Sequence, residues 1–190
     1  MALNLYQIKE MALKSRRAVY SVQQLANLIG KPKSIAKVYL SRLVKKGLAK
    51  RLLRGRITFV DDDYIIATQL LEPSYISLHS ALLFHGLIQQ VPKNTDCVTP
   101  KNSRNYRAHG INYHKIPSSF FYGYEKYQKA GSYIFVADPE KAIIDGIYLH
   151  LIPINMIRDI LNKLNRDKLN KYILRFKGKG QKRLKAICYD

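Results

Sequence analysis

Basic and hydroxyl side chains recur on one face of a short stretch near the N-terminus. Lysine ammonium groups bind phosphate oxygens, and serine hydroxyls hydrogen-bond to phosphates or to the edges of bases. Both kinds of group project from one side of residues 32–46 if that stretch is a helix. The face consists of Lys33, Ser34, Lys37, Ser41 and Lys45. This residue set predicts contact with a nucleic acid.

The helix that would carry this face is the second of a predicted pair. Ser21 and Gln24 form a capping box that begins the first helix, and Gly30 ends it in a left-handed conformation. Pro32 opens the second helix at its first turn. The apolar spacing predicts two core stripes. They are Val22, Leu25, Ala26 and Ile29 in the first helix, and Ile35, Ala36, Tyr39, Leu40 and Leu43 in the second.

A predicted β-hairpin follows the helix pair. Residues 48–53 and 56–60 favour two strands joined by a tight turn at Arg54-Gly55. With a first helix at 4–14, this order predicts a winged helix-turn-helix over residues 1–63. Helix 32–46 would enter the major groove and the hairpin would reach a neighbouring phosphate or the minor groove. The candidate DNA-binding residues are Arg16, Arg17, Lys31, Lys33, Ser34, Lys37, Ser41, Arg42, Lys45, Arg51, Arg54 and Arg56.

Charge is spread unevenly over the 190 residues, which carry 33 Lys and Arg against 13 Asp and Glu, a net charge of +20. Residues 1–60 hold 14 basic residues and one acid, Glu10. Residues 61–150 are nearly neutral, and residues 151–190 hold 11 basic and 3 acidic residues. A polyanionic partner is therefore expected at the N-terminal module. The basic C-terminal helices could extend that footprint or face an acidic protein.

No apolar run approaches the roughly 18 residues of a spanning helix, so we expect no membrane partner. The N-terminus lacks the early charge and apolar stretch of a signal peptide. Cys97 and Cys188 lie far apart and form no CxxC motif. This usage fits a reducing, cytoplasmic location, although one disulfide is possible.

Residues 64–190 predict a second, mixed α/β domain with a small sheet flanked by helices, so the chain is expected to be α+β. The acidic run 61–63 marks the joint and should cap the helix 64–71 or face away from DNA. Further helices are expected at 78–85, 139–149, 155–164 and 167–175, and strands at 96–99, 111–116 and 132–137. The stretch 177–183 is too rich in Gly and Lys to predict a helix. Residues 151–190 form a basic helical tail.

Three arrangements that could support catalysis fail on spacing. His79 and His85 are six residues apart, so their rings face different sides of a helix, and His109 and His114 lack a matched carboxylate. Asp138, Glu140 and Lys141 are the residue types of a metal nuclease site. They lie within four residues at a helix start, however, where each has a capping role. There is no Gly-x-Ser-x-Gly elbow or P-loop. We therefore expect neither an enzyme nor a metal or other cofactor.

The aromatic run FFYGYEKY at 120–127 permits two interpretations. Aromatic side chains can stack on bases, but the local charge is near neutral. A core or a partner surface is the favoured interpretation.

Four motifs in the second domain occur in the order typical of one family. They are YISLHSALLFHGLI (75–88), VTP (98–100), FFYGYE (120–125) and VADPEKAIIDGIYL (136–149). Together with the N-terminal module, they make residues 5–150 resemble the AbiEi family of abortive-infection antitoxins. The matching positions are Ser77, Ala81, Leu82, His85, Gly86, Leu87, Val98, Thr99, Gly123, Pro139, Glu140, Lys141, Ala142 and Asp145.

The resemblance implies a transcriptional autorepressor that binds inverted repeats at its own promoter. It also implies an antitoxin of a type IV toxin–antitoxin system, which antagonises a nucleotidyltransferase-like toxin. The matching positions would define the fold or a partner surface and would not be catalytic. The alternative, which the charge alone supports, is an RNA-binding or general basic nucleic-acid-binding protein without a toxin partner.

Overall fold

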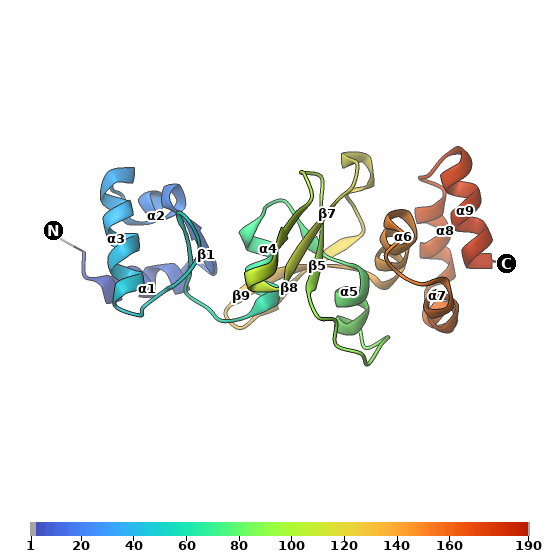
Figure 1. Cartoon of the computed structure of the whole chain (residues 1–190), viewed down its shortest axis with the longest axis horizontal. Helices are drawn as coiled ribbons and strands as arrows, with labels where there is room; N and C mark the ends of the chain where they lie inside the picture. Colours follow the sequence, from blue (N-terminus) through green and yellow to red (C-terminus); the bar gives the residue numbers. More distant parts are fainter. Residues whose placement is uncertain (1–2, 190) are drawn as a thin grey trace. The chain divides into compact units, whose positions relative to one another are not determined.

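Helices and strands alternate along the chain in an α+β arrangement (Figure 1). The computed structural model describes residues 3–189. Two compact units are present: residues up to Glu72 with Tyr127–Ile134, and Pro73–Lys126 with residues from Phe135 onward. The joint therefore lies after the helix at 63–70, whereas the sequence placed it before that helix.

The first unit pairs three helices with a small antiparallel sheet. Its helices are α1 (Leu5–Lys14), α2 (Val22–Ile29) and α3 (Lys33–Lys45), and its strands are β1 (Val19–Ser21), β2 (Lys50–Leu53) and β3 (Arg56–Thr58). In the described residues the sheet has three strands in the order β1-β3-β2. The sequence predicted β2 and β3 and missed β1, which pairs with β3 from a distance along the chain.

One apolar core holds these elements together. The buried side chains come from α1, α2, α3 and the sheet, and they include Ile8, Ala12, Tyr20, Leu25, Ala26, Ile29, Ala36, Leu40, Leu43 and Ile57. Each large apolar side chain contributes about 1.5–3 kcal/mol when buried. The core side of α3 is therefore fixed, and its other side faces outward.

The first unit also includes α4 (Asp63–Leu70) and the hairpin end at Tyr127–Ile134. Asp62 caps α4, since its carboxylate accepts hydrogen bonds from the backbone N–H groups of Tyr64 and Ile65 at 3.0 Å. This confirms that the acidic run caps the following helix.

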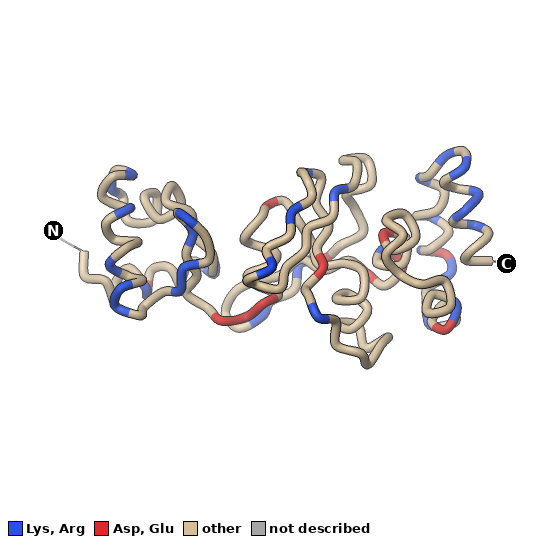
Figure 2. Tube along the Cα trace, in the orientation of Figure 1, with Lys and Arg blue, Asp and Glu red and all other residues tan. Residues whose placement is uncertain are grey.

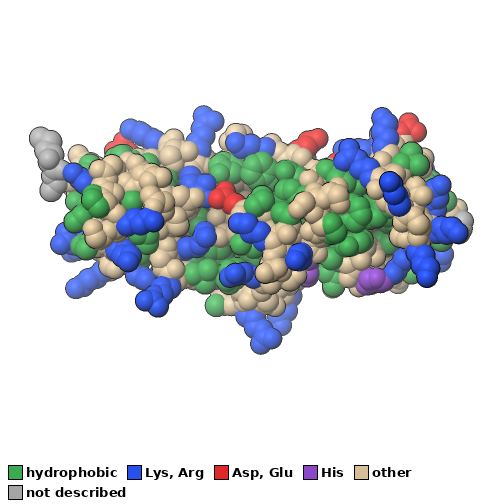
Figure 3. Space-filling view, turned by 90° about the horizontal axis from the view of Figure 1, so that it is seen from above, with side chains coloured by type: hydrophobic (Ala, Val, Ile, Leu, Met, Phe, Trp, Pro, Cys, Tyr) green, Lys and Arg blue, Asp and Glu red, His purple; other side chains and the backbone are tan. Residues whose placement is uncertain are grey.

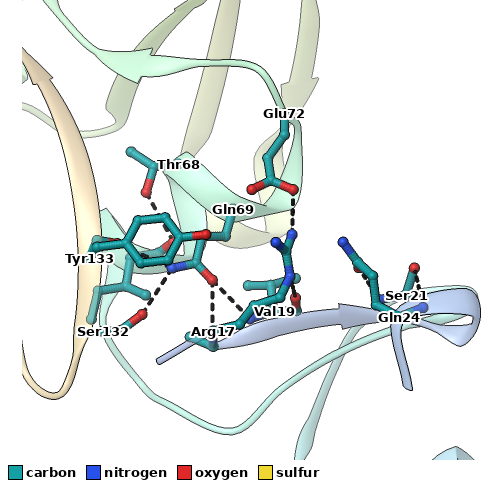
Figure 4. Close-up of polar contacts among 11 residues, drawn as sticks. Arg17, Val19, Ser21, Gln24, Thr68, Gln69, Glu72, Ser132 and Tyr133 are labelled. Atoms are coloured by element: carbon teal, nitrogen blue, oxygen red, sulfur yellow. Dashed lines mark hydrogen bonds and ion pairs between the residues drawn. The ribbon is translucent and has the colours of Figure 1, made fainter. Parts of the chain in front are cut away.

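The buried amide of Gln69 connects α4, β1 and the hairpin end (Figure 4). Its Oε1 accepts from the N–H of Ala18 at 2.8 Å and of Val19 at 3.3 Å. Its Nε2 donates to Ser132 Oγ at 2.9 Å and to the Tyr133 carbonyl at 3.1 Å. Every polar atom of this fully buried side chain therefore has a partner.

The second sheet is mixed, with the strand order β6-β7-β5-β4-β9-β8 in the part of the chain that the structure describes. Its strands are β4 (Tyr75–Ile76), β5 (Thr95–Thr99), β6 (Arg104–Tyr106), β7 (Ile111–Lys115), β8 (Tyr124–Lys129) and β9 (Ser132–Ala137). β4 runs parallel to β9, and β5 runs parallel to β7. β8 and β9 are joined by Ala130-Gly131, both at positive φ, a geometry typical of tight hairpins.

Helices accompany this sheet and form the C-terminal part of the second unit (Figure 1). They are α5 (Leu78–Phe84), α6 (Pro139–Leu149), α7 (Ile154–Ile160), α8 (Arg166–Ile173) and α9 (Gly178–Tyr189), with short 3₁₀ turns at Arg107–His109, Ser118–Phe120 and Leu161–Lys163. The expectation for residues 177–183 was wrong, because most of this stretch is helical. Burial of Leu184, Ile187 and Cys188 outweighs its poor intrinsic propensity. Within residues 3–189, no helix is both long enough and apolar enough to cross a membrane.

Candidate nucleic-acid interface

The helix pair α2–α3 is built as its local sequence signals predict. The Gln24 N–H donates to Ser21 Oγ at 3.2 Å, and the Ser21 N–H donates to Gln24 Oε1 at 2.8 Å. Gly30 closes α2 at φ 61°. Pro32 takes the N-cap position, one residue earlier than predicted, so that α3 begins at Lys33.

All candidate residues on α3 are exposed. They are Lys33, Ser34, Lys37, Ser41, Arg42 and Lys45. The four cations of this set are Lys33, Lys37, Arg42 and Lys45. Within residues 3–189 none of them forms an ion pair, and α3 itself contains no Asp or Glu. Figure 2 shows the basic positions spaced along α3. The helix therefore offers free positive charge to an outside anion.

The predicted core position of Ile35 is wrong, since 43% of its surface is exposed. The buried residues Ala36, Leu40 and Leu43 set the direction of the core. Ile35 is turned away from Ala36 by about 100°. Val38, which is not among the predicted candidate residues, is 46% exposed. Val38 does not lie three or four residues from Ala36, Leu40 or Leu43, so it cannot share their face of the helix. That spacing is the sequence signal that could have identified Val38 as exposed.

The β2–β3 hairpin brings more cations to the first unit. Arg54 is exposed beside Gly55, which adopts φ 74° in the turn. The carbonyl of Gly55 accepts from the Val22 N–H at 3.1 Å, which ties the turn to the start of α2. Arg51 is exposed and Arg56 is half-buried. The turn is thus tied to α2, while Arg51 and Arg54 are exposed to solvent.

Arg17 differs from the other candidates because its guanidinium is already engaged (Figure 4). Nε donates to the Val19 carbonyl at 2.8 Å, and another guanidinium nitrogen pairs with Glu72. We therefore leave Arg17 out of the interface. Arg16 and Lys31 are exposed, and the Arg16 carbonyl accepts a hydrogen bond from Ser132 Oγ at 2.6 Å.

In the second unit, one lysine is buried, unlike the exposed lysines of α3. Lys141 is fully buried and pairs with Asp145 one helical turn along α6. The Asp145 carboxylate also accepts from Tyr75 at 3.0 Å and from Ser77 at 2.8 Å. Ser77 therefore sits at the N-cap of α5 without a side-chain capping bond. Burial raises the pKa of Asp145, although the Lys141 ammonium opposes that rise.

The neighbouring acids of α6 are occupied as well. Asp138 caps the helix by accepting from the Lys141 N–H at 2.9 Å, and it also accepts from the Tyr172 hydroxyl at 2.7 Å. Glu140 accepts from the Asn165 N–H at 2.7 Å. Asp138 therefore caps α6 as predicted, whereas Glu140 bonds to the backbone before α8 and Lys141 pairs with Asp145, so the capping role predicted for these two residues is wrong.

Most rings of the aromatic run pack within the second unit, whereas Tyr127 belongs to the first. The rings of Phe120 and Phe176 stack with centroids 4.1 Å apart, and those of Tyr75 and Tyr124 stack at 4.7 Å. The ring of Tyr122 lies 5.1 Å from Lys141 Nζ. The aromatic side chains of the run in the second unit thus pack against other rings, but they are half-buried and do not belong to the fully buried core.

The described histidines and cysteines do not form one cluster in the structure. His85 Nε2 lies 2.8 Å from the Ala137 carbonyl, and His114 Nε2 lies 2.9 Å from Asp96. Among residues 3–189, no group of three or more His, Cys, Asp and Glu side chains could hold a metal ion. Cys97 and Cys188 are free thiols.

Comparison of the sequence with models of known protein families gives no match, and comparison with curated proteins gives none either.

Proposed function

We propose that the chain is a sequence-specific DNA-binding transcriptional regulator that represses its own gene. The observation that carries this proposal is the outward face of α3, where four unpaired cations and two serines stand together without an acid. Phosphates would hold the helix in place, while its side chains reach base edges in the major groove. The exposed arginines of the β2–β3 hairpin would act as a wing on the adjacent backbone.

The organisation of the first unit supports this proposal. Three helices followed by a hairpin is the order of a winged helix-turn-helix, and the short connection between α2 and α3 suits it. A regulator of this type works where DNA is accessible in the cytoplasm. The two free thiols are compatible with that location.

We further propose an antitoxin role in a type IV toxin–antitoxin system. It rests on the ordered motifs that resemble the AbiEi family, since residue types and spacing alone identify no toxin. Growth of cells that express a neighbouring nucleotidyltransferase-like toxin tests this role. Co-expression of the chain should restore growth, and failure to do so would remove the antitoxin role but leave DNA binding intact.

A mobility-shift titration on the DNA upstream of the gene tests the regulator proposal. Scrambled duplex and single-stranded RNA serve as competitors at two salt concentrations. Tight binding that resists both competitors and weakens in Lys45→Ala is expected. The matched control is Lys93→Ala, because Lys93 is an exposed lysine of the second unit. Equal binding to every polyanion would contradict the proposal.

Equal binding to every polyanion would favour the alternative function, a general basic or RNA-binding protein. One observation supports it: Lys182, Lys185 and Tyr189 line a pocket of about 540 Å³ on α8 and α9. A cation beside an aromatic ring suits a single-stranded nucleic acid. Figure 3 shows Lys and Arg side chains over much of the visible face, which a less selective binder would also use.

A further inference from the structure

The outward face of α3 contains an apolar pair within its cationic surface. Ile35 is 43% exposed and Val38 is 46% exposed. They lie three residues apart, so their side chains neighbour each other on the helix. Their exposure is not needed for packing, because Ala36, Leu40 and Leu43 already fill the core side.

The direction of each side chain shows which residue lies at the centre of this face. With about 100° of rotation per residue, Val38 points roughly 170° away from the mean direction of Ala36, Leu40 and Leu43. Lys37 points only about 90° away from it and Ile35 only about 105° away on the other side, so these two lie at the flanks. Val38 therefore points directly away from the core, toward any groove that α3 enters, whereas Lys37 points sideways.

The residues around Val38 define what it can contact. Ser34 and Ser41 are short and lie one turn before and about one turn after it, so they do not screen it. Arg42 and Lys45 are long cations in the last turn of α3. Lys45 points in nearly the same direction as Val38 but lies about 10 Å further along the helix. The complementary surface therefore has an apolar group opposite Val38 and negative charge opposite the last turn of α3.

Duplex DNA that contains thymine has this combination. Its phosphates flank the major groove, and the thymine C5-methyl is the apolar group displayed on the groove floor. RNA carries uracil without that methyl, and its A-form major groove is too narrow for side chains to read. The charge of α3 thus favours DNA over an apolar protein surface.

We propose that Val38, with Ile35 beside it, contacts thymine methyl groups in the major groove and makes thymine a required base of the binding site. This inference rests on the proposed DNA-binding function. It assigns recognition of a base to an apolar side chain and leaves the cations to hold phosphates.

The test begins with selection of duplexes by the full chain from a random library. Each thymine of the selected site is then replaced, one at a time, by deoxyuridine, which removes the methyl and keeps every hydrogen-bonding group. We expect affinity to fall about threefold to fivefold at one or two positions, the effect of losing one buried methyl. Val38→Ala should bind thymine and deoxyuridine sites equally at one of those positions.

Two further variants make the test specific. Lys45→Ala should weaken binding to both duplexes but keep the preference for thymine. Ile35→Ala should remove the preference at the neighbouring position. Because both apolar side chains are exposed, thermal unfolding of the variants should match that of the parent chain.

Two outcomes would overturn the inference. If every deoxyuridine site binds as well as its thymine parent, or if Val38→Ala retains the full preference, Val38 does not read thymine, although selective DNA binding would stand. If no duplex is enriched and all polyanions compete equally, the DNA-binding function fails and the inference fails with it.

Discussion

The lysines of α3 in the first unit and Lys141 in the second are placed in opposite ways. In the first unit, the cations of α3 are exposed and have no acid partner among the described residues. In the second, Lys141 is fully buried against Asp145, Tyr75 and Tyr122. The same residue type is therefore exposed and available to an outside anion in one place and part of a buried ion pair in the other.

The difference has a simple energetic basis. An exposed lysine keeps its water and gives it up only to a ligand, so its removal barely alters folding. A buried ion pair has already lost its water, and removal of one partner leaves an uncompensated charge. Lysine substitutions should therefore separate folding from DNA binding, unit by unit.

The largest effect is expected for Lys141→Ala. Loss of the ammonium leaves the Asp145 carboxylate buried without its counter-ion, which should lower the free energy of unfolding by about 3–5 kcal/mol. Urea denaturation followed by circular dichroism measures this. Lys93→Ala is the exposed control, and a loss below about 1 kcal/mol in Lys141→Ala would break the comparison.

A smaller loss is expected for Gln69→Leu in the first unit. Its amide is buried but neutral, and the substitution leaves the N–H groups of Ala18 and Val19 without an acceptor. The cost should be on the order of 2–3 kcal/mol. Amide hydrogen exchange at both positions should speed up. Gln23→Leu, on the exposed side of α2, should change neither quantity.

Lys45→Ala should affect binding without affecting folding. If Lys45 neutralises a phosphate, the slope of log K against log salt should become shallower by about 1. Its free energy of unfolding should stay within about 0.5 kcal/mol of the parent value. Affinity titrations at four salt concentrations measure the slope. An unchanged slope would mean that Lys45 does not neutralise a phosphate.

The smallest effect concerns Tyr122 at high pH. Burial raises the pKa of Tyr122 to about 12, from an ordinary value of 10. The folded chain therefore keeps this proton after the unfolded chain has lost it. The resulting stability is complete below pH 10 and declines as the pH rises through 12.

Denaturation midpoints between pH 9 and 11.5 test this dependence. The midpoint should fall more steeply in the parent chain than in Tyr122→Phe, which has no phenol proton to lose. Parallel curves would show that Tyr122 titrates alike in the folded and unfolded chains.

Short-range signals explain most of what the sequence predicted. The Ser21–Gln24 capping box, the left-handed Gly30 and the Asp138-Pro139 helix start each depend on contacts within a few residues. Such contacts form whatever surrounds them, so the helix pair and α6 could be placed from sequence. The Arg54-Gly55 turn likewise depends on residues that are close together in the sequence.

Ile35 shows where local periodicity was insufficient. Its spacing from Tyr39 fits a helical stripe, yet only packing against α1 and α2 decides which stripe is buried. The sequence therefore placed the exposed cations of α3 as the structure has them, but it put Ile35 in the core and did not single out the exposed Val38. Arg17 was selected by charge, and its engagement with Glu72 arises from a residue 55 positions away.

The sequence by itself determined the caps, the turns, the α2–α3 helix pair with its hairpin and the concentration of positive charge near the N-terminus, because these depend on neighbouring residues. The tertiary structure decided the pairing of β1 with β3, the helix at Gly178–Tyr189, the joint after Glu72 and the burial of Lys141. Each of these depends on partners brought together by chain folding. Burial and long-range hydrogen bonds compensate there for weak local propensity or for the cost of removing a charge from water.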